Sequence, residues 1–126
     1  MAHPFKAYDV RGLYGKDIDE ALAYKIGRAF VYYLGAKTVA VGRDMRDSSV
    51  TLGDELIRGL RDSGADVIDI GLASTEMLYF ASIHLGTDGA IMVTASHNPK
   101  EYNGFKFTRK NAIPIGIESG LADIET

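Results

Sequence analysis

Residues Thr38-Val39-Ala40-Val41 form a short run of β-branched and small apolar side chains, which predicts a buried strand. Two similar runs follow, at 66–70 (Asp-Val-Ile-Asp-Ile) and at 90–93 (Ala-Ile-Met-Val). Between these runs we expect one helix over 49–63 and another near 77–85. Strands that alternate with helices of roughly ten to fifteen residues imply βαβ units and a mostly parallel sheet. The pattern therefore predicts an α/β protein.

The flanking segments extend this pattern. Residues 17–34 carry apolar side chains at the spacing of one helix face, with Asp17 and Glu20 as an approximate capping box and Gly35 as the stop. Near the other end, Phe105-Lys106-Phe107-Thr108 is β-like. We therefore expect a further helix before the first parallel strand and a further strand after the last one.

Composition narrows the class of protein and its partners. The 126 residues, of which 46% are hydrophobic, suit one domain over 1–126. Fourteen basic and 17 acidic residues give a net charge of −3, which argues against a nucleic-acid or anionic-membrane partner. The chain contains no cysteine, so disulfides and thiolate metal sites are excluded. No apolar run approaches the ~20 residues of a membrane span, and the first residues lack the apolar core of a signal peptide. We therefore expect a cytoplasmic protein.

Polar segments adjoin the expected strands. Ligands of parallel α/β sheets bind beyond the carboxyl ends of the strands, so the loops there are where chemistry is expected. Three candidate loops are unusually polar: residues 9–12, residues 42–49 and residues 94–99. In the last of these, Ser96 could act as a nucleophile, or Asn98-Pro99 could simply reverse the chain. A Ser–His–Asp hydrolase is disfavoured because no Gly-x-Ser-x-Gly elbow is present.

Four motifs, read together, resemble one enzyme family. They are Ala7-Tyr8-Asp9-Val10-Arg11-Gly12, Val41-Gly42-Arg43-Asp44-Met45-Arg46-Asp47-Ser48-Ser49, Thr94-Ala95-Ser96-His97-Asn98-Pro99 and Tyr102-Asn103-Gly104-Phe105-Lys106. In this order and spacing they resemble the α-D-phosphohexomutases, and Tyr-Asn-Gly-Phe-Lys is nearer the phosphomannomutase/phosphoglucomutase branch. The resemblance implies a three-layer α/β/α sandwich with a mixed, mostly parallel sheet, as in domain 1 of these enzymes.

The resemblance also implies roles for three residues. Ser96 matches the serine that carries the transferable phosphate, Lys106 the general acid/base beside it, and Arg11 the arginine that orients the transferring group. A solvated strand lysine is the alternative for Lys106, and a structural arginine that pairs with Asp9 or Asp44 is the alternative for Arg11. We expect Arg11, Arg43, Ser96 and Lys106 to converge at one edge of the sheet.

Supporting roles follow for six other residues. Tyr8 matches a residue at the sugar-facing wall, although a tyrosine in a first strand is more often core. His97 and Asn98 would shape the loop of the nucleophile or bind the phosphate. Arg43, Asp44 and Arg46 would hold the Arg11 and Ser96 loops in place, with a surface ion network as the alternative.

The resemblance covers the first of the four domains that the family's enzymes have. Mg²⁺ would be held partly by the phosphate of Ser96 and mostly by a loop that this sequence lacks. The final segment, 118–126, has Leu121 and Ile124 at helical spacing and no cap, so we expect the domain to be cut shortly before its natural end.

Two interpretations remain open. The chain is the nucleophile domain of a mutase that acts on a hexose phosphate and is inactive alone, or it is a non-catalytic phosphate-binding or interaction module. In the first case its missing C-terminal domains are its partners. A severed domain would expose an apolar patch, so we also expect a homodimer or a higher assembly.

Overall fold

The computed structural model describes residues 9–95, 101–109 and 113–114 of the chain. Within them, strands and helices follow one another in the order β1 (Asp9–Leu13), α1 (Glu20–Leu34), β2 (Thr38–Arg43), α2 (Asp47–Asp62), β3 (Asp66–Leu72), α3 (Thr75–Leu85), β4 (Gly89–Val93), β5 (Tyr102–Arg109) and β6 (Ile113–Pro114). Each helix and each of the four strands expected from the sequence is present.

The strands form one mixed sheet in the order β1-β5-β4-β2-β3, with β6 paired to the outer part of β5. Strands β3, β2 and β4 are parallel neighbours, whereas β5 lies antiparallel between β4 and β1. The predicted mixed α/β sheet is confirmed, and its parallel part consists of the three β-rich runs that the sequence singles out.

The structure corrects one expectation for residues 9–12. They are not a loop: they belong to β1, whose Val10 lies opposite Phe105 of β5 and is fully buried. The sequence around Val10 has little of the apolar alternation that predicts a strand. The segment becomes a strand because β5 provides hydrogen-bond partners and a buried face for it.

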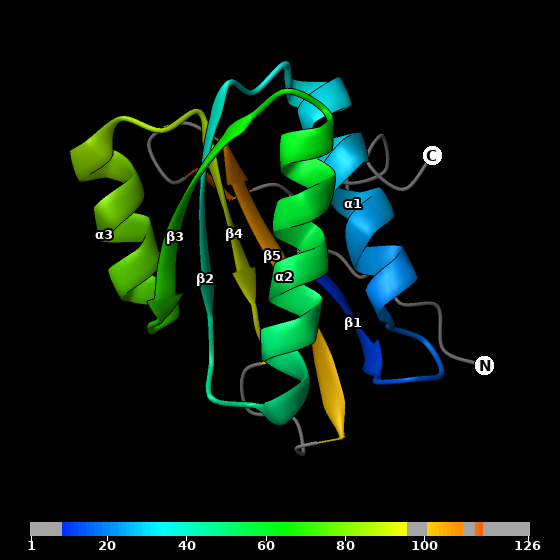
Figure 1. Ribbon diagram of the computed structural model, residues 1–126. Coiled ribbons are helices and arrows are strands. Elements are labelled where there is room, and N and C mark those ends of the chain that lie inside the picture. Colours follow the sequence, from blue (N-terminus) through cyan, green and yellow to red (C-terminus); the bar gives the residue numbers. More distant parts are fainter. Residues whose placement is uncertain (1–8, 96–100, 110–112, 115–126) are drawn as a thin grey trace.

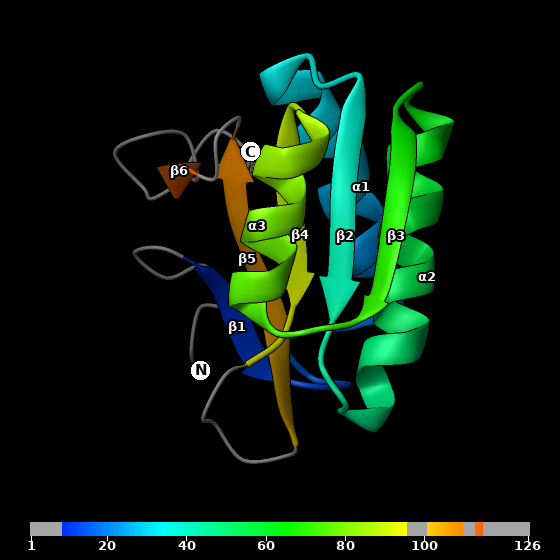
Figure 2. The same cartoon turned by 90° about the vertical axis from the view of Figure 1, so that its left-hand side faces the viewer.

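The helices cover both faces of the sheet. Helices α1 and α2 lie side by side on one face and α3 lies on the other (Figures 1 and 2). The predicted three-layer α/β/α sandwich is therefore confirmed. The larger core lies under α1 and α2, where the ring of Phe30 stacks on that of Phe107 at 5.9 Å between centroids. The core under α3 is small and consists of Ala40, Leu78, Ala90 and Met92.

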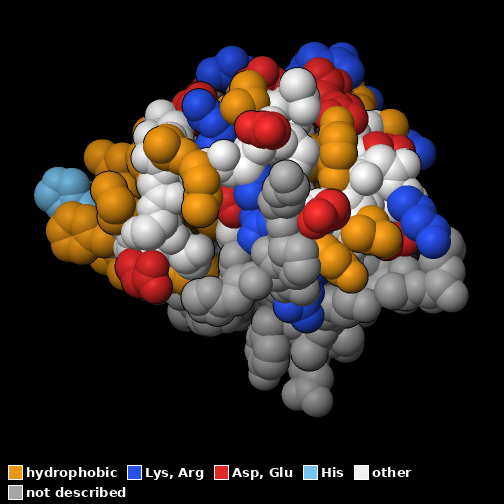
Figure 3. All heavy atoms as spheres, turned by 90° about the horizontal axis from the view of Figure 1, so that it is seen from below, with side chains coloured by type: hydrophobic (Ala, Val, Ile, Leu, Met, Phe, Trp, Pro, Cys, Tyr) orange, Lys and Arg blue, Asp and Glu red, His pale blue; other side chains and the backbone are white. Residues whose placement is uncertain are grey.

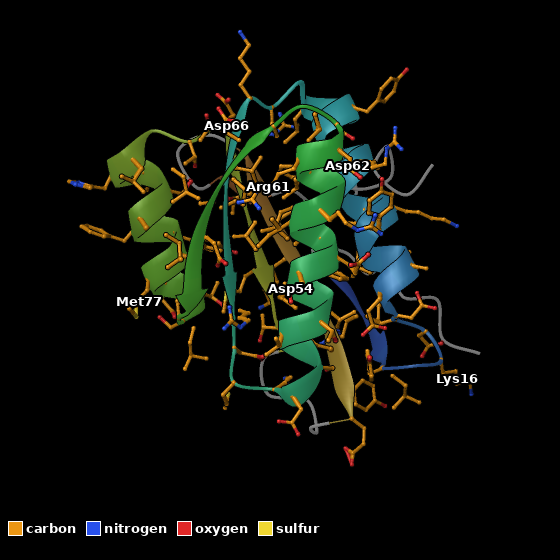
Figure 4. The ribbon with its side chains drawn as sticks, viewed as in Figure 1. Lys16, Asp54, Arg61, Asp62, Asp66 and Met77 are labelled. Carbon is orange, nitrogen blue, oxygen red and sulfur yellow. The ribbon has the colours of Figure 1, made fainter. Side chains whose placement is uncertain are left out.

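Helices α1 and α2 approach each other closely because two glycines face the contact. A Cβ atom on Gly27 would lie 2.5 Å from the carbonyl oxygen of Leu56, and one on Gly59 would lie 2.2 Å from that of Tyr24. At the far end of α2, Asp62 lies beside α1 (Figure 4) and accepts a 2.6 Å hydrogen bond from the Tyr24 hydroxyl. The two helices thus form one rigid layer.

The start of α1 differs from the expectation. Asp19, not Asp17, caps the helix, because its side chain accepts a 2.8 Å hydrogen bond from the amide of Leu22. Asp17 instead accepts a hydrogen bond from the amide of Leu13 at the end of β1. Gly35 ends the helix as predicted, in the left-handed conformation with φ 62°.

Candidate functional site

The polar side chains of interest gather at one edge of the sheet. Strand β1 is antiparallel to β5, which is antiparallel to β4, so β1, β2, β3 and β4 all end at the edge where β5 begins. Figure 3 looks onto this edge, where acidic and basic side chains lie in the middle of the face. This is the edge at which ligands bind in sheets of this class.

The Asp44 carboxylate joins three segments at this edge. One oxygen accepts hydrogen bonds from the hydroxyl of Ser49, at 2.6 Å, and from the amide of Arg46, at 3.2 Å. The other accepts from the hydroxyl of Thr94, at 2.6 Å, and from Nε of Arg46, at 3.0 Å. The Arg46 guanidinium also donates to the carbonyl of Tyr102. The Asp44 carboxylate thereby ties loop 44–46, the start of α2 and the end of β4 together, and Arg46 adds the start of β5.

The Asp44–Arg46 ion pair is largely buried. Their side chains are 14% and 9% exposed, so the pair is not a surface ion network. The pair is shielded from water, and hydroxyl groups donate hydrogen bonds to the carboxylate in addition to those from Arg46. The pair therefore holds a fixed geometry. Thr94 precedes Ser96 by two residues, so this pair fixes the chain just before the predicted nucleophile.

Arg11 and Lys106 lie on the same face of the sheet, the one that α3 covers. Val10 and Phe105 are paired and belong to the core under α1 and α2, so the residues that alternate with them face the other way. Arg11 is paired with Gly104, and Lys106 follows two positions further along β5. The structure thus brings these two predicted cations to one face near the end of β4.

Gly104 allows β1 to approach β5 at this point. A Cβ on Gly104 would lie 2.0 Å from the carbonyl oxygen of Val10 and 2.9 Å from Cα of Arg11. Any side chain here would push β1 away. The glycine of the Tyr-Asn-Gly-Phe-Lys motif therefore sets the distance between the strand that carries Arg11 and the one that carries Lys106.

A cleft of about 520 Å³ opens beside Lys106. Strand ends and the first turn of α3 line it, and its walls include Asp44, Met45, Ala73, Ser74, Thr75, Glu76, Met92, Thr94 and Lys106. The cleft therefore combines a half-buried lysine, hydroxyl groups and the N-terminus of a helix, whose amides attract anions.

Arg43 occupies the same edge but the opposite face. Its Cδ atom lies 3.9 Å from the position that a Cβ on Gly53 of α2 would take, whereas the missing Cβ of Gly42 points toward Leu78 of α3. The structure therefore does not bring the Arg43 side chain to the cleft beside Lys106. The alternation of neighbouring residues along β2 is the physical reason.

A second polar cluster lies near this edge, where β1 ends and α1 begins. The Tyr14 hydroxyl donates to Oε2 of Glu20, and the Thr51 hydroxyl donates to the same oxygen at 2.7 Å. These hydrogen bonds lower the pKa of Glu20, while the bond to Glu20 raises the pKa of Tyr14. The cluster fastens the end of β1 to both helices of the layer.

Four predicted residues, Tyr8, Ser96, His97 and Asn98, lie outside the described residues. In contrast, sequence reasoning assigned no role to Ser49, Thr94 or Asn103, which the structure places in the network around Asp44. All three stand inside the quoted motifs, but nothing local to the sequence indicates that their side chains meet.

The described residues do not by themselves form a magnesium site. None of the described His, Asp and Glu side chains come together in a group of three or more that could hold a metal ion. Asp44, which lines the cleft, already accepts hydrogen bonds with both carboxylate oxygens. No chemical step is therefore assigned to a metal on these residues.

The sequence and the fold both match one family. The family model for phosphoglucomutase/phosphomannomutase, alpha/beta/alpha domain I, matches residues 2–126. The chain belongs to the phosphoglucomutase/phosphomannomutase family. A phosphomannomutase of Klebsiella pneumoniae is 54% identical over 121 residues, which are 96% of this chain and 77% of that protein. One from Escherichia coli K12 is 51% identical over 121 residues, which are 96% of this chain and 26% of that protein.

Solved structures agree with this assignment. A phosphoglucomutase/phosphomannomutase family protein of Burkholderia thailandensis has a TM-score of 0.86 and 40% identity, and the match covers 97% of this chain and 29% of that one. This domain I therefore spans between a quarter and a third of the length of most phosphoglucomutase/phosphomannomutase relatives cited here. Among its described helices, none is long and apolar enough to span a membrane.

Proposed function

We propose that this chain is the nucleophile-bearing domain of a phosphomannomutase/phosphoglucomutase, which moves phosphate between C1 and C6 of a hexose phosphate. The observation that carries the proposal is the cleft beside Lys106. Its wall includes Thr94, two residues before Ser96, and the strand paired to β5 presents Arg11 on the same face. Phosphoryl transfer is suited by the cation Lys106, by an arginine that can orient the phosphate, and by a strand end that leads to a serine.

The proposed reaction has two balanced halves. A hydroxyl oxygen of the hexose phosphate attacks the phosphorus of phosphorylated Ser96, the bond between phosphorus and Oγ breaks, and a hexose bisphosphate forms. Lys106 takes the proton that the sugar hydroxyl loses and supplies one to Oγ of Ser96. The bisphosphate then turns over in the site, and Ser96 attacks its other phosphate, which regenerates phosphoserine and releases the isomeric hexose phosphate.

Other residues of the chain position these groups. The fork of Arg11 suits the oxygens of the transferring phosphate. Tyr8, His97 and Asn98 would shape the sugar-facing and phosphate-facing walls. Asp44 and Arg46 would hold the strand end before Ser96, which their hydrogen bonds to Thr94 and Tyr102 support. The proposal gives Arg43 an indirect role only, since its side chain faces α2.

Mg²⁺ enters the proposal as a property of the whole enzyme. The resemblance assigns it to the family, with a phosphate oxygen of Ser96 as the ligand that this chain supplies. When bound, the ion would neutralise charge on the transferring phosphate. The proposed roles of Lys106 and Arg11 are to move a proton and to orient the phosphate, and they are argued from these side chains alone.

The activity of the whole protein extends beyond this domain. Most of the relatives cited above are three to four times longer than the part that this chain matches. We propose that further domains, a cytoplasmic setting and a hexose phosphate substrate belong to the parent enzyme, and that domain I alone shows no mutase turnover. Complete turnover would need remote binding energy from those domains to hold the bisphosphate while it turns over, whereas a single transfer of phosphate to Ser96 would not require it.

Intact-mass analysis tests the covalent step. The purified chain is incubated with a hexose 1,6-bisphosphate, and we expect the mass of one phosphate to be added, with Ser96 identified by peptide mapping. Ser96→Ala should add none, and Lys106→Met should add phosphate at least about tenfold more slowly. Binding of the bisphosphate without any covalent phosphate would overturn the proposal and favour a phosphate-binding module.

A further inference from the structure

Asn103 is a fully buried polar side chain to which neither the family match nor the proposed chemistry assigns a role. Its amide nitrogen donates to the hydroxyls of Ser48, at 2.7 Å, and Ser49, at 3.0 Å. Its amide oxygen accepts from the backbone amide of Gly104, at 2.8 Å. Both amide hydrogens and the amide oxygen of Asn103 are therefore hydrogen-bonded. Loss of any partner destabilises the fold, because a buried polar group without a partner has lost its hydration and gains no hydrogen bond in return.

The donors and acceptors around Asn103 allow one arrangement. The carboxylate of Asp44 can only accept, so the single hydroxyl proton of Ser49 is committed to it. The oxygen of Ser49 must then act as an acceptor toward Asn103, which requires the amide nitrogen on that side. The amide oxygen is thereby turned toward Gly104.

The hydrogen bonds close into a ring across the edge of the sheet. Ser49 connects Asn103 to Asp44, and Asp44 accepts from the hydroxyl of Thr94. The backbone amide of Thr94 donates to the carbonyl of Gly104 at 2.9 Å, and Gly104 donates back to Asn103. The ring spans the ends of β2 and β4, the first turn of α2 and the start of β5.

We infer that Asn103, acting through Ser49, is a positioning residue for phosphoryl transfer at Ser96. The inference rests on the proposed function. The ring holds the start of β5 against the end of β4, so it sets the offset between Lys106, two residues beyond Gly104, and the chain that leads from Thr94 to Ser96. Asn103 touches neither reacting group. Its effect is on their spacing, to which transfer between oxygens in line is sensitive.

Adjacent serines supply a matched pair of variants. Ser49→Ala breaks the ring, because it removes both the donor to Asp44 and the acceptor for Asn103. Ser48→Ala removes only the hydrogen bond between Ser48 and Asn103, which is not part of the ring. Ser48 is half-buried and lies on the wall of an open pocket of about 430 Å³, so water can replace its hydroxyl. Asn103→Ala removes the amide itself.

The first measurement is amide hydrogen exchange by NMR on the whole chain. Because the Thr94 amide is held by Gly104, we expect its exchange to rise about tenfold relative to that of Ile91, inside β4, in Asn103→Ala and Ser49→Ala. In Ser48→Ala the ratio should stay within about twofold of the wild type. Comparison with an amide of the same strand separates loss of the ring from general destabilisation.

The second measurement is the rate at which a hexose 1,6-bisphosphate phosphorylates Ser96, followed by intact mass over a concentration series. Asn103→Ala and Ser49→Ala should lower the rate at saturation about tenfold, with the half-saturating concentration within about twofold of wild type, because positioning and not binding is lost. Ser48→Ala should react like the wild type.

The outcomes separate the two proposals. A wild-type chain that gains no phosphate overturns the proposed function, and the exchange of the Thr94 amide then decides alone whether Asn103 holds this strand end. Unchanged Thr94 exchange in Ser49→Ala, or an equal effect of Ser48→Ala, overturns the positioning role. So does an unchanged saturating rate in Ser49→Ala when the wild type reacts. If Asn103→Ala fails to fold, the pair of serine variants decides both measurements.

Discussion

The hydroxyl of Thr94 donates a 2.6 Å hydrogen bond to the carboxylate of Asp44, which joins the end of β4 to the loop after β2. The backbones meet at the same place, since the amide of Asp44 donates to the carbonyl of Val93 at 3.1 Å. Two neighbouring parallel strands are therefore locked together just beyond their last paired residues. This lock makes the edge of the sheet a rigid support for the segment that carries Ser96.

Asp44→Asn should destabilise the domain by about 3 kcal/mol. The amide of asparagine keeps the shape of the side chain but removes the negative charge that the buried Arg46 guanidinium faces. Its nitrogen is a hydrogen-bond donor, and it would face hydroxyl and amide groups that also donate at this position. Urea unfolding measures the change. Asp54→Asn, on the exposed side of α2 (Figure 4), should change stability by less than about 0.5 kcal/mol. Equal effects of the two substitutions would contradict the buried role of Asp44.

Gly104→Ala should cost about 3 kcal/mol or more, because its Cβ would collide with the carbonyl oxygen of Val10. The loss should be concentrated in β1, so amides of β1 should exchange faster than those of β2. Gly53→Ala is the control. A Cβ there meets only Cδ of Arg43 at 3.9 Å, and alanine favours the helix by up to about 1 kcal/mol. A tolerated alanine at 104 would show that β1 can move away without loss.

The Tyr14–Glu20–Thr51 cluster should make stability depend on pH at both extremes. Because folding lowers the pKa of Glu20, its hydrogen bonds contribute fully above the ordinary value of 4.5, and this contribution is lost as the pH falls through the folded pKa. Folding raises the pKa of Tyr14 from 10.0, so the contribution of the phenol is kept below pH 10.0 and is lost as the pH rises through the folded pKa.

Glu20→Gln tests this dependence. At pH 7 the variant should be less stable than the wild type by up to about 1 kcal/mol, because the cluster is partly exposed and solvent screens it. The difference should shrink toward pH 3. Urea midpoints at a series of pH values measure it, with Glu76→Gln on exposed α3 as the charge control. A difference that grows as the pH falls would have the wrong sign for a lowered pKa.

The outer face of α3 should drive self-association. Met77, Phe80, Ile83 and Leu85 are each at least half exposed, and the ring of Phe80 stacks on that of His84 of the same helix. Figure 3 shows hydrophobic side chains gathered around the histidine of α3, and Figure 4 shows Met77 pointing away from the sheet. We expect a concentration-dependent dimer or higher assembly in analytical ultracentrifugation.

Phe80→Ser should weaken this association about tenfold or more, since burial of one phenylalanine contributes roughly 1.5–3 kcal/mol. Tyr32→Ser, at an exposed position of α1 on the other face of the sheet, should leave it unchanged. A single monomeric species of the wild type at the highest soluble concentration would remove the prediction.

Local patterns in the sequence determined the parallel part of the fold. Buried runs such as 38–41 and 90–93 carry enough adjacent apolar side chains to indicate a strand without knowledge of its partner. Gly35 indicated a helix end because its left-handed conformation is a property of one residue. The motif residues that matched the family were also readable in order along the chain, so the family itself was predicted from them and is confirmed.

Tertiary structure alone decided which of those residues meet. Strand β1 has little apolar pattern of its own and forms by pairing with β5, which Gly104 allows it to approach. Side chains alternate between the two faces of the sheet, so the faces on which Arg43 and Lys106 lie can be inferred from the buried residues beside them. Which neighbours are buried is known only once the strand register is set. The ring through Asn103, Ser49, Asp44 and Thr94 closes because Thr94 bonds to Asp44, 50 residues away, and Asn103 bonds to Ser49, 54 residues away. These two hydrogen bonds depend on strand pairings that no local pattern specifies.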